Sequence, residues 1–205
     1  WCKSLTDWIK QYNTWINTPG EKGINLSTIF FDYDLIYGDV SFENSLTESI
    51  FNSTDNNQLF YAFLGTNAIK KPAPLGFFRQ FLLEQDEEHK DAFDIKNRAI
   101  MPLVDAARVL CISRNIKGIT NTYQRFKKLA DLEPQNADLY LECAEAFNTL
   151  IWFRTEEGLQ NSSNGRYINL QELSKVDKVK LKNCFQPIND IQDLIKNRFQ
   201  LTYFT

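Results

Sequence analysis

The chain has 205 residues, with 23 Lys or Arg against 26 Asp or Glu and a formal net charge of −3. This near balance argues against a dedicated nucleic-acid binder, which usually carries an excess of basic residues, and 43% apolar residues argue against intrinsic disorder. Aromatic residues make up 14% of the chain, whereas eight glycines and six prolines are few for an all-β protein. The composition therefore predicts a mainly α-helical domain with an aromatic core, and by itself it does not indicate a function.

Residues 1–18 are predicted to form an N-terminal connecting helix. Its apolar residues recur three and four positions apart and so share one face of a helix: Trp1, Leu5, Trp8, Tyr12 and Trp15. The helix is expected to end before Pro19 and Gly20. This face either packs wholly in the core or also contacts a domain outside this chain. The start at Trp1 rather than Met suggests a fragment of a longer protein.

Residues 24–205 are predicted to form the body of a single helical domain, beginning with an irregular stretch over 24–39. Apolar periodicity then predicts helices over about 41–53, 58–69, 101–114, 120–132, 136–160 and 174–203. With the N-terminal helix, this is a bundle of about seven helices. Asp39 or Ser41 can cap the helix at 41–53, and Thr120 can cap the helix that follows Gly118. Pro187 should kink or split the last helix.

The segment over residues 77–96 has an apolar run, a charged stretch and a second short apolar run. This order is typical of a β-hairpin, with its turn near Asp86–His89. A helix followed by a loop would also fit the pattern. We therefore expect at most one small hairpin in an otherwise helical chain.

Several chemistries lack the residues they need. The four cysteines lie far apart and there is a single histidine, so no structural zinc site is expected; the thiols should be buried and reduced. His89 stands in an acidic run and is expected to be a solvated turn residue. Asp32 and Asp34 have the spacing of a metal-binding acid pair, but no Gly-Ser turn precedes them. We therefore expect no catalytic residue and no metal site in this chain.

Targeting and membrane signals are also missing from the sequence. No apolar run approaches the ~18–20 residues that a membrane-spanning helix needs, and the first residues do not form a signal peptide. We therefore expect a cytoplasmic protein that binds neither membrane nor nucleic acid.

Charged residues inside apolar surroundings are the candidate functional residues. They are Asp32, Asp39, Asp94, Lys96, Asp105, Arg108 and Arg125. Such charges either pair with one another or line a cleft, where Lys96, Arg108 and Arg125 would suit a phosphate or carboxylate. The candidate substrate-binding residues are Asp32, Asp39, Asp94, Lys96, Arg108 and Arg125. We expect Asp94, Lys96, Asp105 and Arg108 to converge near Asp32 and the helix of Arg125. Asp105 and Arg108 are favoured as a structural pair and Lys96 as a functional residue.

At these residues the chain resembles a known family. The matching segments are the tryptophans at 1, 8 and 15 with Pro19, then IFFDYDLIYGD (29–39), PLGFFRQF (74–81), HKDAFDIKNRAIMPLVDAARVLCI (89–112), GITNTYQRF (118–126) and LSKVDKVKLKNCF (173–185). In this order they resemble the nucleotidyltransferase substrate-binding domain, the C-terminal helical part of bacterial signal-transduction proteins similar to PII-uridylyltransferase. One departure is Asp34, which stands where that family commonly has arginine.

The resemblance implies a nucleotidyltransferase catalytic domain upstream and absent here, often behind CBS-pair or cyclic-nucleotide-binding-like modules. Mg²⁺ and a nucleoside triphosphate would be needed only by that catalytic domain, and this chain would hold no cofactor. It would act as a non-catalytic domain that binds and positions the substrate, which could be a protein. The alternatives are a regulatory module that docks a protein or senses a ligand, and a structural helical lid. A Gly-Ser followed by Asp-x-Asp just upstream of Trp1 would discriminate between them.

Overall fold

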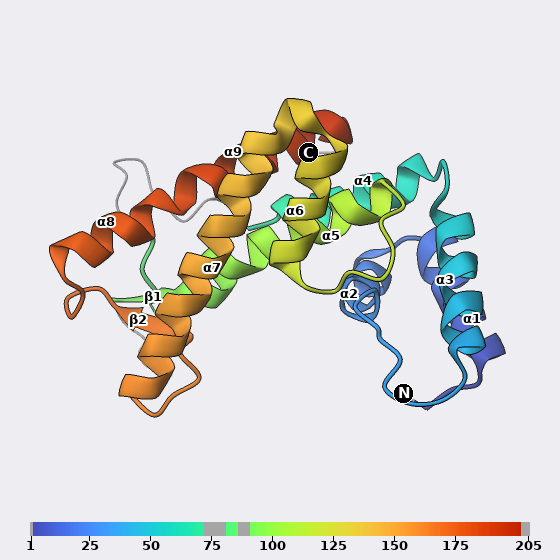
Figure 1. Ribbon diagram of the computed structural model, residues 1–205, viewed down its shortest axis with the longest axis horizontal. Helices are drawn as coiled ribbons and strands as arrows, with labels where there is room; N and C mark the ends of the chain where they lie inside the picture. The colour runs from blue at the N-terminus through green and yellow to red at the C-terminus, as the bar shows by residue number, and fades with distance from the viewer. Residues whose placement is uncertain (1, 72–80, 86–90, 202–205) are drawn as a thin grey trace.

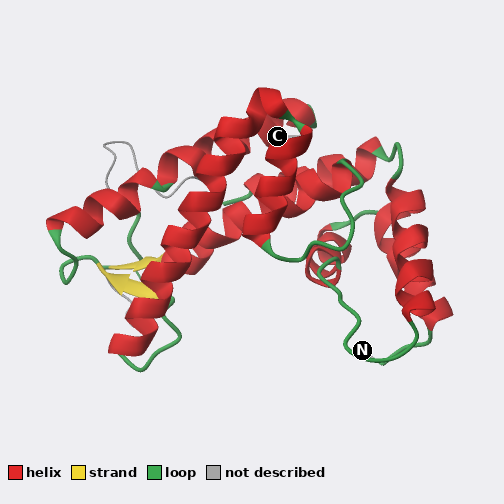
Figure 2. Ribbon diagram, in the orientation of Figure 1, coloured by secondary structure: helices red, strands yellow, loops and turns green. Residues whose placement is uncertain are grey.

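The computed structural model describes residues 2–71, 81–85 and 91–201, and it confirms a mainly α-helical fold (Figures 1 and 2). The helices are α1 (Leu5–Asn17), α2 (Glu21–Phe30), α3 (Val40–Thr54), α4 (Gln58–Ile69), α5 (Met101–Ser113), α6 (Thr122–Leu132), α7 (Ala137–Gln160), α8 (Lys175–Asn183) and α9 (Phe185–Arg198). Two short strands, β1 (Ala92–Asp94) and β2 (Tyr167–Asn169), pair with each other. A π-helical turn over Lys96–Ile100 leads directly into α5.

The molecule is elongated, with α1–α3 at one end and the small sheet and α8 at the other (Figure 1). Helices α4 and α5 run through the middle and connect the two ends (Figure 1). The antiparallel course of α6 and α7 follows from their short connection, which is a single turn over Pro134–Asn136. Helix α2 packs against α4, and α4 packs against α5, in the middle part of the molecule (Figure 1). Segments that are distant in the sequence meet there.

Side-chain caps fix where several helices begin. Asp39 accepts a hydrogen bond from the Ser41 amide at the start of α3, as expected. The cap of α6 is Asn121, whose Oδ1 accepts from the Gln124 amide, rather than the expected Thr120. Both residue types suit this position because their side-chain oxygens satisfy free amides of the first turn.

Helix α2 corrects the expectation of an irregular stretch over residues 24–39, since its first part is helical to Phe30. Ser27 and Thr28 are polar but buried in the core. They interrupt the apolar periodicity by which a helix is recognised in the sequence. Their hydroxyls donate to the carbonyls of Ile24 and Asn25 in the same helix, at 2.9 Å each. Burial is tolerated because these hydroxyls have partners.

The small sheet differs from the expected hairpin in its second strand. Strand β1 lies within residues 77–96, but its antiparallel partner is β2, with Phe93 opposite Ile168. The backbone of Glu84 still exchanges hydrogen bonds with Ala92 and Asp91, so the two parts of this segment approach each other. The expected turn at 86–89, including His89, lies outside the described residues. Local sequence could not predict this pairing, because the two paired strands are more than 70 residues apart in the chain.

Pro187 splits the last helix, as predicted. Helix α8 ends at Asn183, Cys184 separates the two segments, and α9 begins at Phe185. Pro187 then occupies the first turn of α9, where its missing N–H needs no partner. Helix α9 ends at Arg198, five residues before the expected end at Tyr203, which lies outside the described residues.

The core is rich in aromatic rings, as the composition predicted. In the N-terminal part, Tyr12 and Trp15 are buried, and Trp15 stacks on Phe30 at 5.5 Å between ring centroids. At the other end Phe93 packs on Phe185 at 5.6 Å. On the apolar face of α1, Tyr12 and Trp15 thus belong to the core, whereas Leu5 and Trp8 are only partly buried. Trp1 lies outside the described residues.

A buried carboxylate holds the ends of four helical segments together. Glu133 is 3% exposed and follows α6, and it accepts hydrogen bonds from Arg114 after α5, from Tyr140 of α7 at 2.5 Å and from Arg198 of α9 at 2.5 Å. Burial alone would raise the pKa of Glu133, but these partners outweigh it and lower the pKa to about 2. The carboxylate is therefore fully charged at neutral pH and fixes the packing of this part.

All four cysteines are unpaired. Cys111, Cys143 and Cys184 are buried, as expected for structural thiols, whereas Cys2 is exposed. Across the described ranges, none of the helices is both long enough and apolar enough to traverse a bilayer.

Candidate functional site

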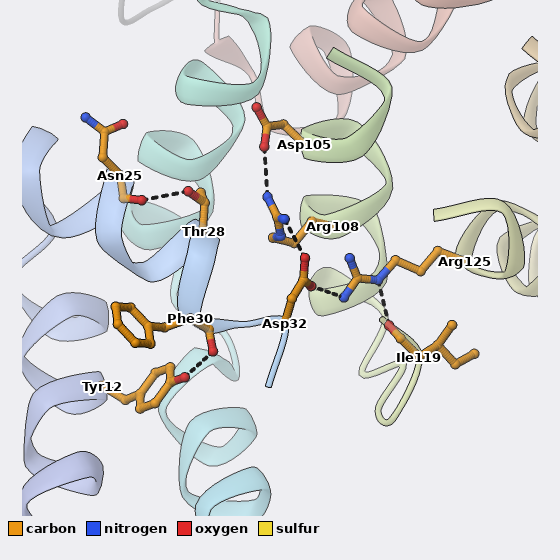
Figure 3. Close-up of polar contacts among 9 residues, drawn as sticks. All are labelled: Tyr12, Asn25, Thr28, Phe30, Asp32, Asp105, Arg108, Ile119 and Arg125. Carbon is orange, nitrogen blue, oxygen red and sulfur yellow. Dashed lines mark hydrogen bonds and ion pairs between the residues drawn. The ribbon is translucent and has the colours of Figure 1, made fainter. Parts of the chain in front are cut away.

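Asp32 joins two arginines from different helices (Figure 3). Its Oδ2 accepts a hydrogen bond from Arg108 Nη2 of α5 at 2.5 Å, and its Oδ1 accepts one from Arg125 Nη2 of α6. Both guanidiniums are buried, with Arg108 6% and Arg125 4% exposed, whereas the Asp32 side chain is 26% exposed. The predicted convergence of these three residues is therefore present in the structure.

Local structure places Asp32 at this point. It is the second residue after α2, and its amide donates to the Ile29 carbonyl at 3.3 Å, which continues the turn at the end of the helix. The Tyr12 hydroxyl of α1 donates to the Phe30 carbonyl and anchors the same helix end (Figure 3). Arg125 is oriented by a second bond, in which its Nε donates to the Ile119 carbonyl at 2.7 Å.

Asp105 supplies a second carboxylate to Arg108. Its Oδ1 accepts from Arg108 Nη1 at 2.8 Å, across one turn of α5, as the spacing of three predicted. Two carboxylates thus balance two guanidiniums. Burial raises the pKa of Asp105 above its ordinary value despite the opposing effect of Arg108. Burial also acts to raise the pKa of Asp32, but hydrogen bonds and charge from Arg108 and Arg125 outweigh it and the pKa is lowered.

A cleft of about 420 Å³ with both polar and apolar lining opens beside this cluster, between α2, α4 and α5. Its walls carry three cationic side chains, one carboxylate, two amides and one hydroxyl: Lys70, Lys71, Arg108, Asp105, Asn25, Asn67 and Thr28. Clefts of this size accommodate small polar ligands or a protruding side chain of a partner. The cleft thus offers both hydrogen-bond donors and positive charge.

Lys71 is held at the far edge of this cleft by contacts with two distant segments. Gln192 of α9, itself buried, donates to the Lys71 carbonyl at 2.8 Å, and Lys71 Nζ donates to Asn97 Oδ1 at 2.9 Å. Lys71 also borders a second polar pocket of about 410 Å³, which includes Arg98 and Arg166. Lys71 lines both pockets, and we refer to the two together as the Lys71 cleft.

Asp94 organises the second half of the Lys71 cleft. It is 3% exposed and accepts hydrogen bonds from the Asn97 amide at 2.9 Å, from Asn97 Nδ2 at 2.8 Å and from Arg166 Nη2 at 2.7 Å. Burial would raise its pKa, but the bonds from Arg166 and Asn97 lower it below the ordinary value. Asp94 therefore fixes Asn97, and through it the ammonium group of Lys71.

The structure separates residues that were expected to form one cluster. Asp94 bonds to Arg166 and Asn97 rather than to Asp32, Arg108 or Arg125. Lys96 is half-buried and forms no ion pair with any residue that the structure describes. Asp39 caps α3 and takes no part in either group. Arg108 and Arg125 both bond to Asp32, whereas Lys96 begins the π-helical turn and takes no part in the Asp32 cluster.

Sequence reasoning missed the residues that line the cleft most directly. Lys71 stands just before Pro72 and after the predicted helix over 58–69, and Asn67 is a polar residue within that helix. Arg166 lies in the loop after α7, where no periodicity guides a prediction. The only available signal was the polar turn Asn161–Gly165 beside Arg166.

Among the described residues, no group of three or more His, Cys, Asp or Glu side chains is placed to hold a metal ion. The buried carboxylates are engaged by arginines and amides instead.

The chain was compared with known families, curated proteins and solved structures. Residues 58–199 match the family described as "Putative nucleotidyltransferase substrate binding domain". The chain belongs to this family. No curated protein and no solved structure matches the chain.

The matched residues of this substrate-binding domain run from the first residue of α4 to just past α9. Lys71, Arg108, Arg125 and Arg166 all lie within them. Asp32 lies outside them, on the connection that follows α2. The name implies an associated nucleotidyltransferase domain.

Proposed function

We propose that this chain binds and positions the substrate of a nucleotidyltransferase domain and transfers no nucleotide itself. The observation that carries the proposal is the Lys71 cleft, which lies mostly within the family-matched residues. Two of its cations are held in place, Lys71 by Gln192 of α9 and by Asn97, and Arg166 by Asp94 of β1. A prearranged polar surface of this kind reduces the entropy lost when a ligand binds.

The chemistry of the Lys71 cleft favours a ligand that carries a carboxylate or a phosphate together with hydrogen-bonding groups. Lys71 and Arg166 supply positive charge, since Arg166 is partly exposed while it bonds to Asp94. Asn25 and Asn67 supply side-chain amides that can both donate and accept. An exposed acidic or polar segment of a protein substrate meets these requirements.

The finer proposal follows the resemblance to PII-uridylyltransferase-like proteins. The chain would be one domain of a bacterial, cytoplasmic signal-transduction protein whose catalytic domain precedes it. That domain would bring Mg²⁺ and the nucleoside triphosphate, because phosphoryl transfer depends on metal ions and positioning. CBS-pair or cyclic-nucleotide-binding-like modules could accompany it. The substrate would be a PII-type signalling protein.

Nucleotide transfer assays test the proposal. The purified chain, with Mg²⁺, labelled UTP or ATP and a PII-type protein, should label nothing. The same chain joined to its nucleotidyltransferase domain should label the acceptor, and the catalytic domain alone should do so with a higher KM. Metal-dependent labelling by the isolated chain would contradict the non-catalytic assignment. An unchanged KM after removal of the chain would contradict the binding role.

A further inference from the structure

Arg108 and Arg125 form a pair of buried cations that needs an anion. They come from neighbouring helices, α5 and α6, and lie at most 6% exposed, both within the family-matched residues. Two buried guanidiniums side by side repel each other, and an uncompensated buried charge is strongly destabilising. Asp105 can neutralise only one of them, since it bonds to Arg108 alone among the residues described. The remaining charge is met by Asp32.

The Asp32 carboxylate lies between the two arginines, as a bound anion would. It comes from outside the matched residues, on the connection between α2 and α3, and each of its two oxygens faces a different arginine. Its carboxylate is the most exposed member of the group, at 26% of the side chain. The Asp32 side chain is therefore partly open to solvent, whereas the two arginines are buried in the core.

The carboxylate leaves part of the arginine pair unused. Arg108 Nε and Arg125 Nη1 are buried and have no hydrogen-bond partner among the described residues. Buried donors normally have partners, so unpaired ones call for an explanation. A phosphate group carries more acceptor oxygens and more charge than a carboxylate, and arginine pairs suit it well. The pair thus has the donors for an oxyanion larger than the one that occupies it.

Each arginine of the pair also lines a pocket. Arg108 lines the cleft of about 420 Å³ that also holds Lys71. Arg125 lines a separate pocket of about 310 Å³, together with Tyr33 and Lys117. Each arginine of the pair therefore borders a pocket that a small anion can enter.

We propose that Arg108 and Arg125 form a phosphate-binding site, that Asp32 occupies it as an internal ligand, and that free phosphate or a phosphate ester competes with Asp32. Displacement would release the segment from Asp32 to Asp39, which carries the almost fully exposed Ile36 and Tyr37. This inference concerns the arginine pair and does not depend on the proposed function.

The test is anion rescue of the Asp32→Ala chain, followed by thermal unfolding. Asp32→Ala should melt about 5 °C or more below the wild type. Sodium phosphate should restore at least half of this loss, with a saturable dependence on concentration, whereas sodium chloride of equal ionic strength should not. Asp34→Ala is the matched control, since Asp34 is exposed and two residues away. It should melt like the wild type in both salts, which also corrects for the general stabilising effect of phosphate.

Further variants keep the test decisive. If Asp32→Ala does not fold in chloride, refolding in phosphate should recover helical circular dichroism. No recovery in phosphate would overturn the proposal. In Asp32→Asn the rescue should persist, and it should be lost when Arg125→Gln is added. A phosphate effect equal in the wild type, Asp34→Ala and Asp32→Ala would also overturn it and would indicate a non-specific salt effect.

Discussion

The Asp32 carboxylate accepts a hydrogen bond from Arg125, 93 residues further along the chain. With the bond from Arg108, this contact ties the connection after α2 to both α5 and α6. A single partly exposed carboxylate therefore links the N-terminal helices to the residues that match the substrate-binding family. The arrangement predicts which charged residues stabilise the fold and which are available to a ligand.

Arg108→Ala should destabilise the chain strongly, by about 3–5 kcal/mol, because it leaves Asp105 and Asp32 without their shared partner. Lys96→Ala is the matched control and should change the free energy of unfolding by less than about 0.5 kcal/mol. Urea denaturation of both variants measures the difference. Equal losses in the two variants would contradict a structural role for Arg108.

Glu133 should make stability depend on pH in the acid range. Its pKa of about 2 in the folded chain lies below its ordinary value of 4.5, so its contribution is complete above pH 4.5 and is lost as the pH falls toward 2. The shift corresponds to about 3 kcal/mol. Glu133→Gln should therefore flatten the loss of stability between pH 5 and pH 2, and Glu142→Gln, at an exposed position, should not. Parallel pH profiles for the wild type and Glu133→Gln would contradict this role.

Gly165→Ala should weaken the loop that positions Arg166. Gly165 has φ +64°, and an added Cβ would overlap the carbonyl oxygen of Arg154. Gly118 has a similar φ of +69° with no atom within 4 Å of the added Cβ, so Gly118→Ala isolates the backbone cost of about 1–2 kcal/mol. Gly165→Ala should exceed that cost by about 2 kcal/mol. Chemical denaturation measures both, and equal losses would show that the loop relaxes freely.

A thiol reagent should modify one cysteine in the folded chain. Cys2 is exposed, whereas burial raises the pKa of Cys111 and of Cys184 to about 12 and also raises that of Cys143. Because the thiolate is the reactive form, the three buried thiols should react only after unfolding. Titration with a disulfide reagent should count one fast thiol natively, four in denaturant, and none natively in Cys2→Ser. Two or more fast native thiols would contradict the burial described above.

Most of the helices and part of the candidate site could be predicted from the sequence, whereas α2 could not, because its buried Ser27 and Thr28 interrupt the apolar pattern. Helix α4 matches its predicted bounds because apolar residues, the break before it and Pro72 agree. Asp105 and Arg108 pair because helical spacing of three is local information. By contrast, Asp94 meets Arg166 only through the pairing of β1 with β2, a long-range contact without a periodic signal. Lys71 joins the site because α9 and Asn97 hold it there, and neither contact is visible in its neighbours along the chain.

The most direct test of the proposed substrate-binding role is the KM of nucleotide transfer after Lys71→Glu. The protein that joins this chain to its nucleotidyltransferase domain would be assayed with labelled UTP and a PII-type acceptor. Lys71→Glu should raise the KM for the acceptor at least about tenfold and leave kcat within about twofold, because it removes binding energy without touching the chemistry. Lys128→Glu, at an exposed position on α6, should change neither constant. An unchanged KM in Lys71→Glu would contradict the assignment of the Lys71 cleft as the substrate site.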